Sequence, residues 1–368
     1  MKTVVVGMSG GVDSSVAAIK LIEEGYNVIG LFMRNWDSSI NNDILGNPTL
    51  NNNICPQEQD YNDALSVCKK LNIPLHRIDF VKEYWDYVFT YFLDELKKGR
   101  TPNPDIMCNK YIKFDAFVKE AKKLGADYIA TGHYARVKDG KLYRGLDNNK
   151  DQSYFLSQLS NKQLENVLFP VGELEKPVVR KIAEKYDLIT AHKKDSTGIC
   201  FIGERNFKDF LKNYLPNIPG KILNIDTNEV VGEHIGLMYY TIGQRKGLNL
   251  GGNNDKLFVV GKNLDKNILY VAFNEKNDYL ISTEAVIEQV NWISDHKPLE
   301  CTAKFRYRQT DNQVKLEYLD NFNIIVKYPQ GVKSVTPGQA CVFYENDECL
   351  GGGIIKEVRK NGQKLWYL

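Results

Sequence analysis

Near its start the chain reads Thr3-Val4-Val5-Val6-Gly7-Met8-Ser9-Gly10-Gly11-Val12-Asp13-Ser14-Ser15. Three consecutive valines predict a short strand over Lys2–Gly7 packed on both faces, because β-branched side chains suit a pleated, buried surface. From Ser14 the apolar residues follow helical spacing, and Gly25 is placed to end that helix. The glycine-rich turn, with Asp13 or Ser14 available as a cap, presents backbone N–H groups at a helix N-terminus, which favours a phosphate.

Composition sets the broad class of protein. The chain has 368 residues, of which 43% are hydrophobic and 26% are charged, as is typical of a soluble protein with two or three domains. No apolar run reaches membrane-spanning length and no signal peptide is visible, so we expect a cytoplasmic protein that does not enter a membrane. Seven cysteines without regular spacing argue against a disulfide framework, and no zinc motif is present. The net charge of +2 gives no support by itself for nucleic-acid binding.

Strands and helices alternate up to about residue 200. This order predicts an α/β fold with a doubly wound parallel sheet, in which ligands bind beyond the carboxyl ends of the strands. The glycine-rich turn, Met33 and the Thr131-Gly132-His133 turn all fall at such ends. The expected elements are strands at 26–33, 75–80 and 127–132 and helices at 58–71, 84–96 and 111–124.

The second half of the chain has a different pattern of predicted elements. From about residue 205 short strands and Pro/Gly turns predominate, which predicts a small central domain and then a C-terminal β-barrel. We therefore divide the chain into domains at 1–204, 205–276 and 277–368. Asn41–Asn53 contains six asparagines and is predicted to be a mobile surface insertion.

Two further segments carry reactive side chains. Arg100–Asn109 has prolines at 102 and 104, which predicts a stiff loop rather than a helix. In it Asp105 precedes Cys108 by three residues, so one turn would bring a carboxylate to a thiol that is reactive as the thiolate. Asp195–Gly203 carries Cys200, and two such cysteines in a reducing compartment can alternate between thiol, persulfide and a transient disulfide.

The motifs together resemble a known family. The loop at 9–15 is similar to the pyrophosphate loop of the ATP-pyrophosphatase superfamily, whose members split ATP into AMP and pyrophosphate. With the segments at 103–109, 130–134, 150–154, 198–201 and 240–245 in this order, the whole chain resembles the tRNA-specific 2-thiouridylases. The resemblance implies an N-terminal ATP-pyrophosphatase (adenine nucleotide hydrolase-like) domain, a central domain and a C-terminal barrel. It also implies an ATP-dependent sulfurtransferase that replaces the C2 oxygen of the wobble uridine of tRNA by sulfur.

The resemblance also assigns roles to residues. ATP, as its Mg²⁺ complex, is expected at Gly7, Met8, Ser9, Gly10, Gly11, Val12, Asp13, Ser14, Met33 and Gly132. Cys108 matches the nucleophile, Cys200 matches the persulfide carrier, and Asp105 is the candidate general acid or base. The family's RNA-contacting positions correspond to Asn103, Pro104, Asp105, His133, Lys150, Asp151, Gln152, Arg306, Tyr307 and Gln339. The implied partners are tRNA and a persulfide donor, either a cysteine desulfurase or a relay protein.

Three alternatives remain open. The first is an ATP-pyrophosphatase that amidates a small metabolite and has no use for the two cysteines. The second is a non-enzymatic, ATP-gated module that binds tRNA or carries sulfur. The third concerns the cofactor: Asp105, Cys108 and Cys200 would hold an iron–sulfur cluster, which we favour less than a cluster-free site.

Overall fold

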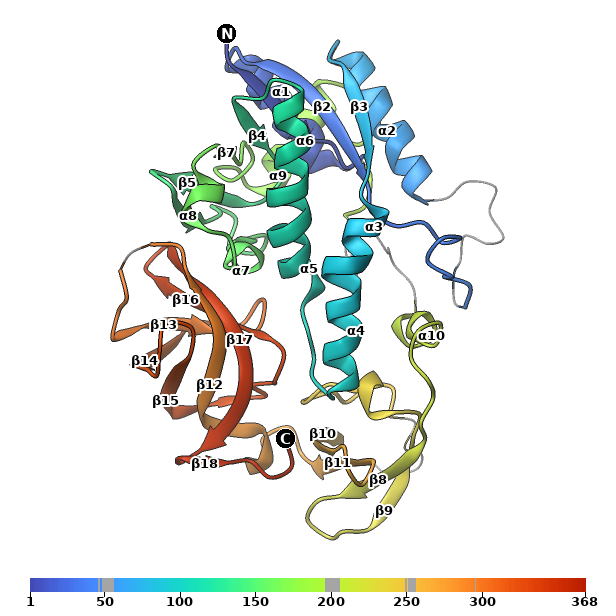
Figure 1. The fold of residues 1–368 in the computed structure, drawn as a ribbon, viewed down its shortest axis with the longest axis vertical. Helices are drawn as coiled ribbons and strands as arrows, with labels where there is room; N and C mark the ends of the chain where they lie inside the picture. The colour runs from blue at the N-terminus through green and yellow to red at the C-terminus, as the bar shows by residue number, and fades with distance from the viewer. Residues whose placement is uncertain (46, 48–55, 196–205, 249, 251–255, 295) are drawn as a thin grey trace. The chain divides into compact units, whose positions relative to one another are not determined.

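The computed structural model describes residues 1–45, 47, 56–195, 206–248, 250, 256–294 and 296–368 (Figure 1). Its contacts divide the chain into two compact units, which we describe separately. Unit 1 comprises Met1–Thr90, Pro104–Asn213 and Asn346–Leu350. Unit 2 comprises Tyr91–Asn103, Tyr214–Glu345 and Gly351–Leu368.

A five-stranded parallel sheet forms the centre of unit 1, with strand order β3-β2-β1-β4-β7. Val5 in β1 pairs with Ile29 in β2 and with Ile129 in β4, so β1 lies in the middle of the sheet. All four strand pairings are parallel, which confirms the predicted fold class. The strands are β1 (Thr3–Gly7), β2 (Asn27–Arg34), β3 (Leu75–Asp79), β4 (Tyr128–Ala130) and β7 (Val167–Leu168).

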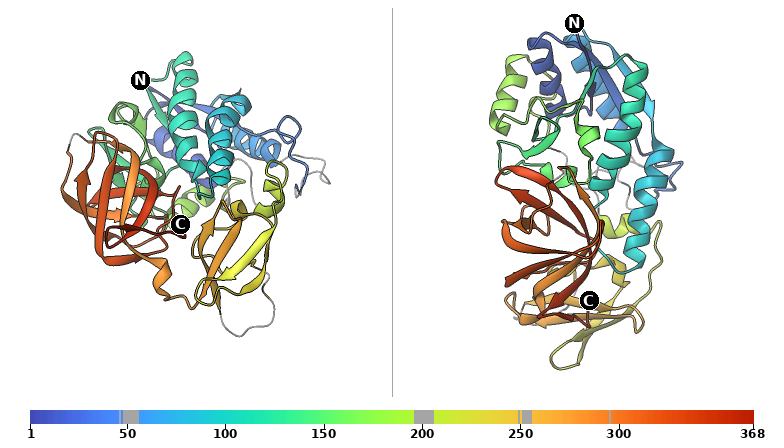
Figure 2. Two further views of the ribbon diagram at one scale, coloured as in Figure 1. Left: turned by 60° about the horizontal axis from the view of Figure 1, so that its bottom comes forward. Right: turned by 60° about the vertical axis from the view of Figure 1, so that its left-hand side comes forward.

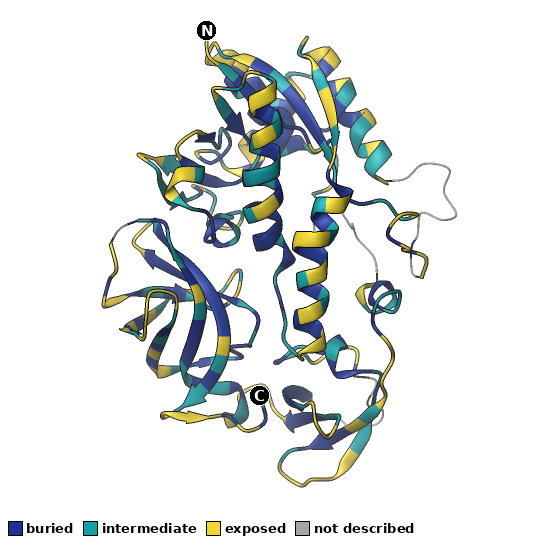
Figure 3. Ribbon diagram, in the orientation of Figure 1, coloured by how far each residue is buried: buried dark blue, intermediate teal, exposed yellow. Residues whose placement is uncertain are grey.

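Helices cover both faces of this sheet (Figure 3). On one face, Val4 and Val6 belong to a buried apolar cluster with residues of α1 (Val12–Glu23), α2 (Pro56–Lys70) and α9 (Lys176–Lys185). On the other face, a Cβ atom at Gly7 would lie 3.6 Å from Phe117 of α6 (Phe117–Lys123). Strand residues alternate between faces, so this two-sided cover explains why β1 is apolar without interruption.

Two stretches predicted as ordinary helices contain π-helical turns. The helix expected at 84–96 is observed as α3 (Val81–Tyr84), η1 (Trp85–Phe89) and α4 (Thr90–Lys97). The helix expected at 111–124 begins earlier, as α5 (Pro104–Met107) and η2 (Cys108–Ala116), and continues into α6. The prediction of a stiff loop through Asn109 is therefore wrong beyond Asn103. Proline is compatible with the first turn of a helix, where its missing N–H has no intrahelical acceptor to lose.

The rest of unit 1 consists of short elements. A hairpin of β5 (Ala135–Lys138) and β6 (Lys141–Arg144) pairs through β6 with Glu348 and Cys349. The other elements are α7 (Ser153–Leu156), α8 (Asn161–Leu164) and α10 (Phe207–Leu211). In the Asn-rich stretch, Asn41, Asp43 and Asn47 are buried rather than surface-exposed, and Trp36 donates a hydrogen bond to Asp43 (3.0 Å). Residues 46 and 48–53 of that stretch lie outside the described residues.

Unit 2 contains a four-stranded sheet of order β10-β11-β8-β9 and a barrel (Figure 2). In the sheet, β11 runs parallel to β8 while the other two pairings are antiparallel. Its strands are β8 (Gly220–Asn224), β9 (Val230–His234), β10 (Leu257–Asn263) and β11 (Ile268–Phe273), with the short helix η3 (Leu237–Tyr239) after β9.

Six antiparallel strands close into the barrel in the order β12-β15-β14-β13-β16-β17, because β12 also pairs with β17. Val326, Phe343 and Ile355 are fully buried within it. The predicted C-terminal barrel is thus confirmed. Its strands are β12 (Ile281–Trp292), β13 (Glu300–Lys304), β14 (Asn312–Tyr318), β15 (Ile324–Lys333), β16 (Ala340–Glu345) and β17 (Glu348–Lys360), with η4 (Asp278–Leu280) before them and β18 (Gln363–Lys364) after.

No helix in the described part of the chain is long and apolar enough to cross a membrane.

Candidate active site

The glycine-rich loop joins β1 to α1 as predicted. Gly11 is the N-cap residue of α1, and Gly25 follows the helix with a φ of +83°. The expectation that Asp13 or Ser14 caps the helix is wrong, because both lie within its first turn. Instead the Ser14 and Ser15 hydroxyls donate to the Gly11 carbonyl (3.1 and 2.8 Å). No side-chain cap bonds to the helix start, and the N–H groups of a first helical turn have no intrahelical acceptor.

Two close approaches require glycine in and beside this loop. Gly10 has a φ of +71°, and a Cβ atom there would lie 2.1 Å from the Asp60 carbonyl oxygen. At the end of β4, a Cβ atom at Gly132 would lie 2.7 Å from the Ser14 nitrogen. The backbone of the loop is therefore packed directly against α2 and against the 131–134 turn.

Asp13 is the centre of a charged network at this loop. The Lys176 ammonium, at the start of α9, lies 2.7 and 2.8 Å from the two Asp13 carboxylate oxygens. The Tyr134 hydroxyl donates to Asp13 as well (2.7 Å), and burial followed by the Asp13 charge raises the pKa of that phenol. Lys176 is 8% exposed, so a nearly buried cation offsets the negative charge that the loop carries next to its N–H groups.

Asp195 extends the network. Its carboxylate pairs with Lys176 (2.8 Å), with Arg180 (2.8 Å) and with Lys150 (2.6 Å). Burial alone would raise the pKa of Asp195, but the hydrogen bonds from Lys150 and Lys176 lower it to about 2. The Asp195 carboxylate is therefore charged at neutral pH and links the predicted residue Lys150 to Asp13 through Lys176.

A second lysine supports the loop from the other direction. The Lys193 ammonium donates to the Gly10 carbonyl (2.9 Å) and pairs with Asp60 and Asp63 of α2. Burial opposes its charge, but the two carboxylates raise the pKa of Lys193. None of the sequence motifs includes Lys176, Arg180 or Lys193. Local sequence does not reveal the pairs that hold the loop, because Lys176 lies 163 residues from Asp13 and Lys193 lies 133 residues from Asp60.

The motifs at 131–134 and 150–154 meet in unit 1. Gln152 and Tyr134 exchange hydrogen bonds, from the Tyr134 N–H to the Gln152 side chain (2.9 Å) and from the Gln152 N–H to the Tyr134 carbonyl (2.8 Å). Asp151 is buried and accepts bonds from the Gly145 N–H and from both the N–H and hydroxyl of Ser153. The predicted residues Lys150, Asp151 and Gln152 thus lie beside the loop, each with protein partners.

His133 follows Gly132 and is 8% exposed. Its Nδ1 atom lies 2.7 Å from the Thr131 hydroxyl and its Nε2 atom 3.5 Å from the Lys113 ammonium. Burial, and then the Lys113 charge, lower the pKa of His133 well below its usual range. The imidazole is therefore neutral at pH 7, and any contact it makes with RNA is a neutral one.

Two of the three residues predicted to handle sulfur lie within the described part of the chain. Asp105 is in α5 and Cys108 begins η2, so the two side chains are separated by about one helical turn, as expected. Cys108 is fully buried. Next to it, Asn109 donates to the Phe155 carbonyl (2.9 Å), while its side-chain oxygen is buried and has no hydrogen-bond partner among the described residues. Cys200 lies outside the described residues, so its position relative to Cys108 stays a prediction.

Comparison with known proteins places the chain in a family. Family models match it in three consecutive ranges: a tRNA methyl transferase HUP domain over 2–204, a tRNA methyl transferase PRC-barrel domain over 208–273 and an aminomethyltransferase beta-barrel domain over 282–355. The tRNA-specific 2-thiouridylase MnmA of Mycoplasmopsis synoviae is 59% identical over 100% of this chain and 99% of its own length. The enzymes of the same name from Mesoplasma florum and Bacillus cytotoxicus are 60% and 56% identical, over 97% and 99% of this chain and 99% and 97% of their own lengths. The chain belongs to the tRNA-specific 2-thiouridylase family.

The thiouridylase relatives match over nearly the whole chain, whereas two of the three family descriptions name a tRNA methyl transferase. Identity over the full length decides between them in favour of the thiouridylases. The three matched ranges follow the same order as our domains at 1–204, 205–276 and 277–368, but the boundaries themselves stay predictions.

Four of the predicted RNA-contacting positions lie in unit 2, namely Asn103, Arg306, Tyr307 and Gln339. Arg306 and Tyr307 lie in the bend and turn that follow β13 and do not belong to a strand. Arg308 has a φ of +63°, which a strand does not allow. Gln339 donates to the Thr101 carbonyl (2.7 Å), two residues before Asn103, and therefore also braces the protein itself.

Metal binding has little support among the described residues. None of their His, Cys, Asp and Glu side chains form a group of three placed to hold an ion. Asp105 and Cys108 offer two ligands of the four that an iron–sulfur cluster takes, so the described part of the site does not fit a cluster. Asp13 offers oxygen ligands beside the loop, which fits a Mg²⁺ ion that arrives with a nucleotide.

Proposed function

We propose that this chain is a tRNA-uridine 2-sulfurtransferase, which converts the wobble uridine of tRNA to 2-thiouridine and ATP to AMP and pyrophosphate. The observation that carries the proposal is the network around Asp13, which joins the glycine-rich loop to the motifs at 131–134 and 150–152. A loop of this kind serves ATP cleavage, and full-length identity to thiouridylases supports the acceptor.

In the first half-reaction the C2 oxygen of uracil attacks the α-phosphate of ATP and pyrophosphate leaves. This adenylation is needed because a carbonyl oxygen is a poor leaving group, whereas AMP is a good one. Gly7–Ser14 would hold the phosphates through backbone N–H groups at the start of α1, with Met33 and Gly132 beside the nucleotide. Mg²⁺ bound with ATP, near Asp13, would supply charge neutralisation for the departing pyrophosphate.

In the second half-reaction sulfur replaces the AMP. The terminal sulfur of a Cys200 persulfide attacks C2 and AMP leaves, and then the Cys108 thiolate attacks the Cys200 sulfur, which releases the thiocarbonyl. Alternatively, Cys108 attacks first and the released hydrosulfide attacks C2. Both routes end with a Cys108–Cys200 disulfide and balance without a further oxidant. Asp105, about one turn from Cys108, would take up or return the proton of the thiol.

The partners follow from this chemistry. The target base must leave the anticodon stack, and Asn103, Pro104 and Asp105 are our candidates to receive it. His133, Lys150, Asp151, Gln152, Arg306, Tyr307 and Gln339 are our candidates for the remaining RNA contacts. A cysteine desulfurase or a persulfide relay protein would load Cys200, and the reducing cytoplasm would reopen the disulfide.

One assay tests the proposal. Purified protein is incubated with ATP, Mg²⁺, an unmodified tRNA transcript and a persulfide donor (a cysteine desulfurase with free cysteine), and the digested RNA is searched for 2-thiouridine. We expect one AMP for each thiolated base and no product from Cys108→Ala. Absence of 2-thiouridine from folded wild-type protein would overturn the assignment. A Cys200→Ser variant that keeps full ATP turnover would instead favour amidation of a small metabolite.

A further inference from the structure

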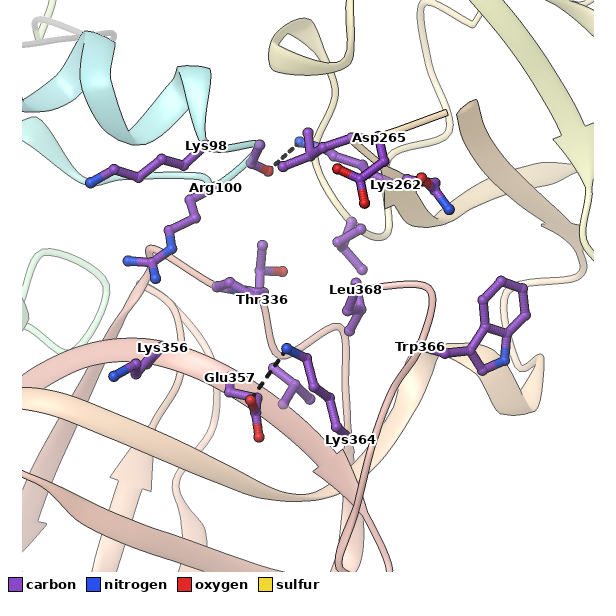
Figure 4. A pocket seen from close by; sticks show the side chains of 16 residues that line it. Lys98, Arg100, Lys262, Asp265, Thr336, Lys356, Glu357, Lys364, Trp366 and Leu368 are labelled. Atoms are coloured by element: carbon purple, nitrogen blue, oxygen red, sulfur yellow. Dashed lines mark hydrogen bonds and ion pairs between the residues drawn. The ribbon is translucent and has the colours of Figure 1, made fainter. Parts of the chain in front are cut away.

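A cavity of about 330 Å³ lies within unit 2 and contains none of the predicted site residues (Figure 4). Its lining comes from the segment after α4, from the end of β10 and from the barrel with the residues after β18. Five cationic side chains line it, against the two acidic side chains of Asp265 and Glu357. The cations are Lys98, Arg100, Lys262, Lys356 and Lys364.

Lys262 is the most unusual of these cations. It is 9% exposed, and its ammonium donates to the Gly99 carbonyl (2.8 Å). None of the described carboxylates forms an ion pair with it. An ammonium has three donors, and burying it without a counter-ion is costly. Burial accordingly lowers the pKa of Lys262 to about 7. An anion in the cavity would offset this cost and would use the remaining donors.

Lys98 is closely paired with Glu95 (2.8 Å), whereas the other three cations leave donors for an anion. Lys356 and Lys364 make loose pairs, 3.6 Å from Glu288 and 3.4 Å from Glu357. Arg100 engages both Glu95 and Glu288 through the same nitrogen, Nη1 (3.0 and 3.1 Å). A guanidinium has five donors in a planar fork that suits phosphate oxygens.

The cavity also has an aromatic edge. Trp366 lines it and is 66% exposed, with its ring held edge-to-face against Tyr270 (5.3 Å between centroids). Trp366 and the cations line the same cavity, and an exposed indole ring together with cations in one site is a combination that recognises a nucleotide, since the base stacks and the phosphate pairs.

We propose that this cavity binds a nucleoside monophosphate unit, with the phosphate on Lys262 and its neighbouring cations and the base against Trp366. The unit is either a free nucleotide or one residue of an RNA strand. The site goes beyond the proposed thiolation chemistry. It adjoins the segment that leads to Asn103, because Lys262 holds Gly99 and Thr101 bonds to Pro337 and Gln339.

Calorimetric titration with AMP tests the free-nucleotide source. A non-hydrolysable ATP analogue is kept at saturation so that the proposed ATP site is already filled. We expect wild-type protein to bind one AMP, Lys262→Met to bind it at least tenfold more weakly, and Lys262→Arg to stay within threefold of wild type. Lys266→Met removes an exposed charge that directly follows the cavity-lining residues 262–265 without itself lining the cavity, and it should match wild type. Trp366→Ala changes an exposed side chain and should weaken the binding of AMP at least threefold. This variant therefore tests the proposal even if Lys262→Met fails to fold.

Binding of a tRNA transcript at several salt concentrations tests the RNA source. If the phosphate belongs to RNA, Lys262→Met lowers the slope of log K against log salt by roughly 0.7–0.9, the contribution of one phosphate contact. If the ligand is a free nucleotide, that slope is unchanged and only AMP binding falls. Wild-type AMP affinity and wild-type salt slope together in folded Lys262→Met would overturn the proposal.

Discussion

At the scale of single residues, Lys176 has the most consequential contacts. It is nearly buried and bonds to both Asp13 and Asp195. The predicted loop residue Asp13 was evident from the sequence, but its partner was not, because Lys176 follows it by 163 residues. Charge pairing over such a distance depends on how α1 and α9 pack, and no local pattern encodes it.

We predict that Lys176→Met lowers ATP-dependent AMP formation at least tenfold, which corresponds to about 1.4 kcal/mol of transition-state stabilisation. The variant leaves Asp13 as an uncompensated carboxylate beside the N–H groups that would receive pyrophosphate, and it repels the incoming phosphates. AMP release with tRNA and sulfide present is the measurement. Lys181→Met, on the exposed side of the same helix, is the matched control and should keep wild-type rates. Equal rates for the two variants would contradict the role of Lys176.

A second prediction at the residue scale concerns Lys262 and the pH dependence of the free energy of unfolding. The native state releases the proton near pH 7, whereas the unfolded chain keeps it up to the ordinary value of 10.5. Between these values the native state binds fewer protons, so this lysine makes the free energy of unfolding rise with pH, by about 1.4 kcal/mol per pH unit. Urea unfolding at stepped pH should show this rise for wild type and for Lys266→Met. Lys262→Met should lack it, and an identical pH dependence in all three proteins would refute the assignment.

At the scale of elements, the strand–turn–helix unit at the N-terminus was predictable and the π-helical turns were not. The valine run and the glycine turn are local signals, and β1 and α1 follow them closely. In η2, Phe114 has non-helical backbone angles (φ −115°, ψ 15°) and its side chain is fully buried. We therefore attribute the wider π-helical turn to the tertiary packing of this side chain. Residue type alone does not report such packing.

Two glycines with similar positive φ angles, Gly10 (+71°) and Gly25 (+83°), yield an element-scale prediction. Gly25→Ala, at the end of α1, meets no atom within 4 Å and should cost only the strain of a left-handed alanine, about 1 kcal/mol. Gly10→Ala suffers the same strain and also drives its methyl group into the Asp60 carbonyl. We expect it to lower the melting temperature by at least twice as much as Gly25→Ala and to abolish calorimetric binding of ATP. ATP binding that survives in Gly10→Ala would show that the loop tolerates displacement from α2.

At the scale of the whole molecule, the order of the domains along the chain was predictable, but the segments that make up each compact unit were not. A parallel sheet followed by a barrel follows from the change in strand and helix pattern along the chain. However, Tyr91–Asn103 clusters with the C-terminal sheets, and Asn346–Leu350 clusters with the N-terminal unit. Thr101 explains why Tyr91–Asn103 clusters with the C-terminal sheets, because its N–H donates to the Pro337 carbonyl and its own carbonyl accepts from the Gln339 side chain. Such long-range backbone bonds have no signature in the sequence near either partner.

The last prediction concerns one complete catalytic cycle of the chain. Each thiolation should convert Cys108 and Cys200 into a disulfide, so protein loaded with one persulfide and given no thiol should make at most one 2-thiouridine per chain. Adding dithiothreitol and fresh sulfur donor should restart turnover, because the reductant returns both thiols. Mass analysis of the peptides after a single turnover should show the disulfide in wild type and its absence in Cys108→Ala. Cys301→Ala removes a buried cysteine of the barrel, not of the proposed site, and should leave the one-turnover limit in place. Multiple turnovers without a reductant would show that the sulfur leaves by a route that spares Cys108.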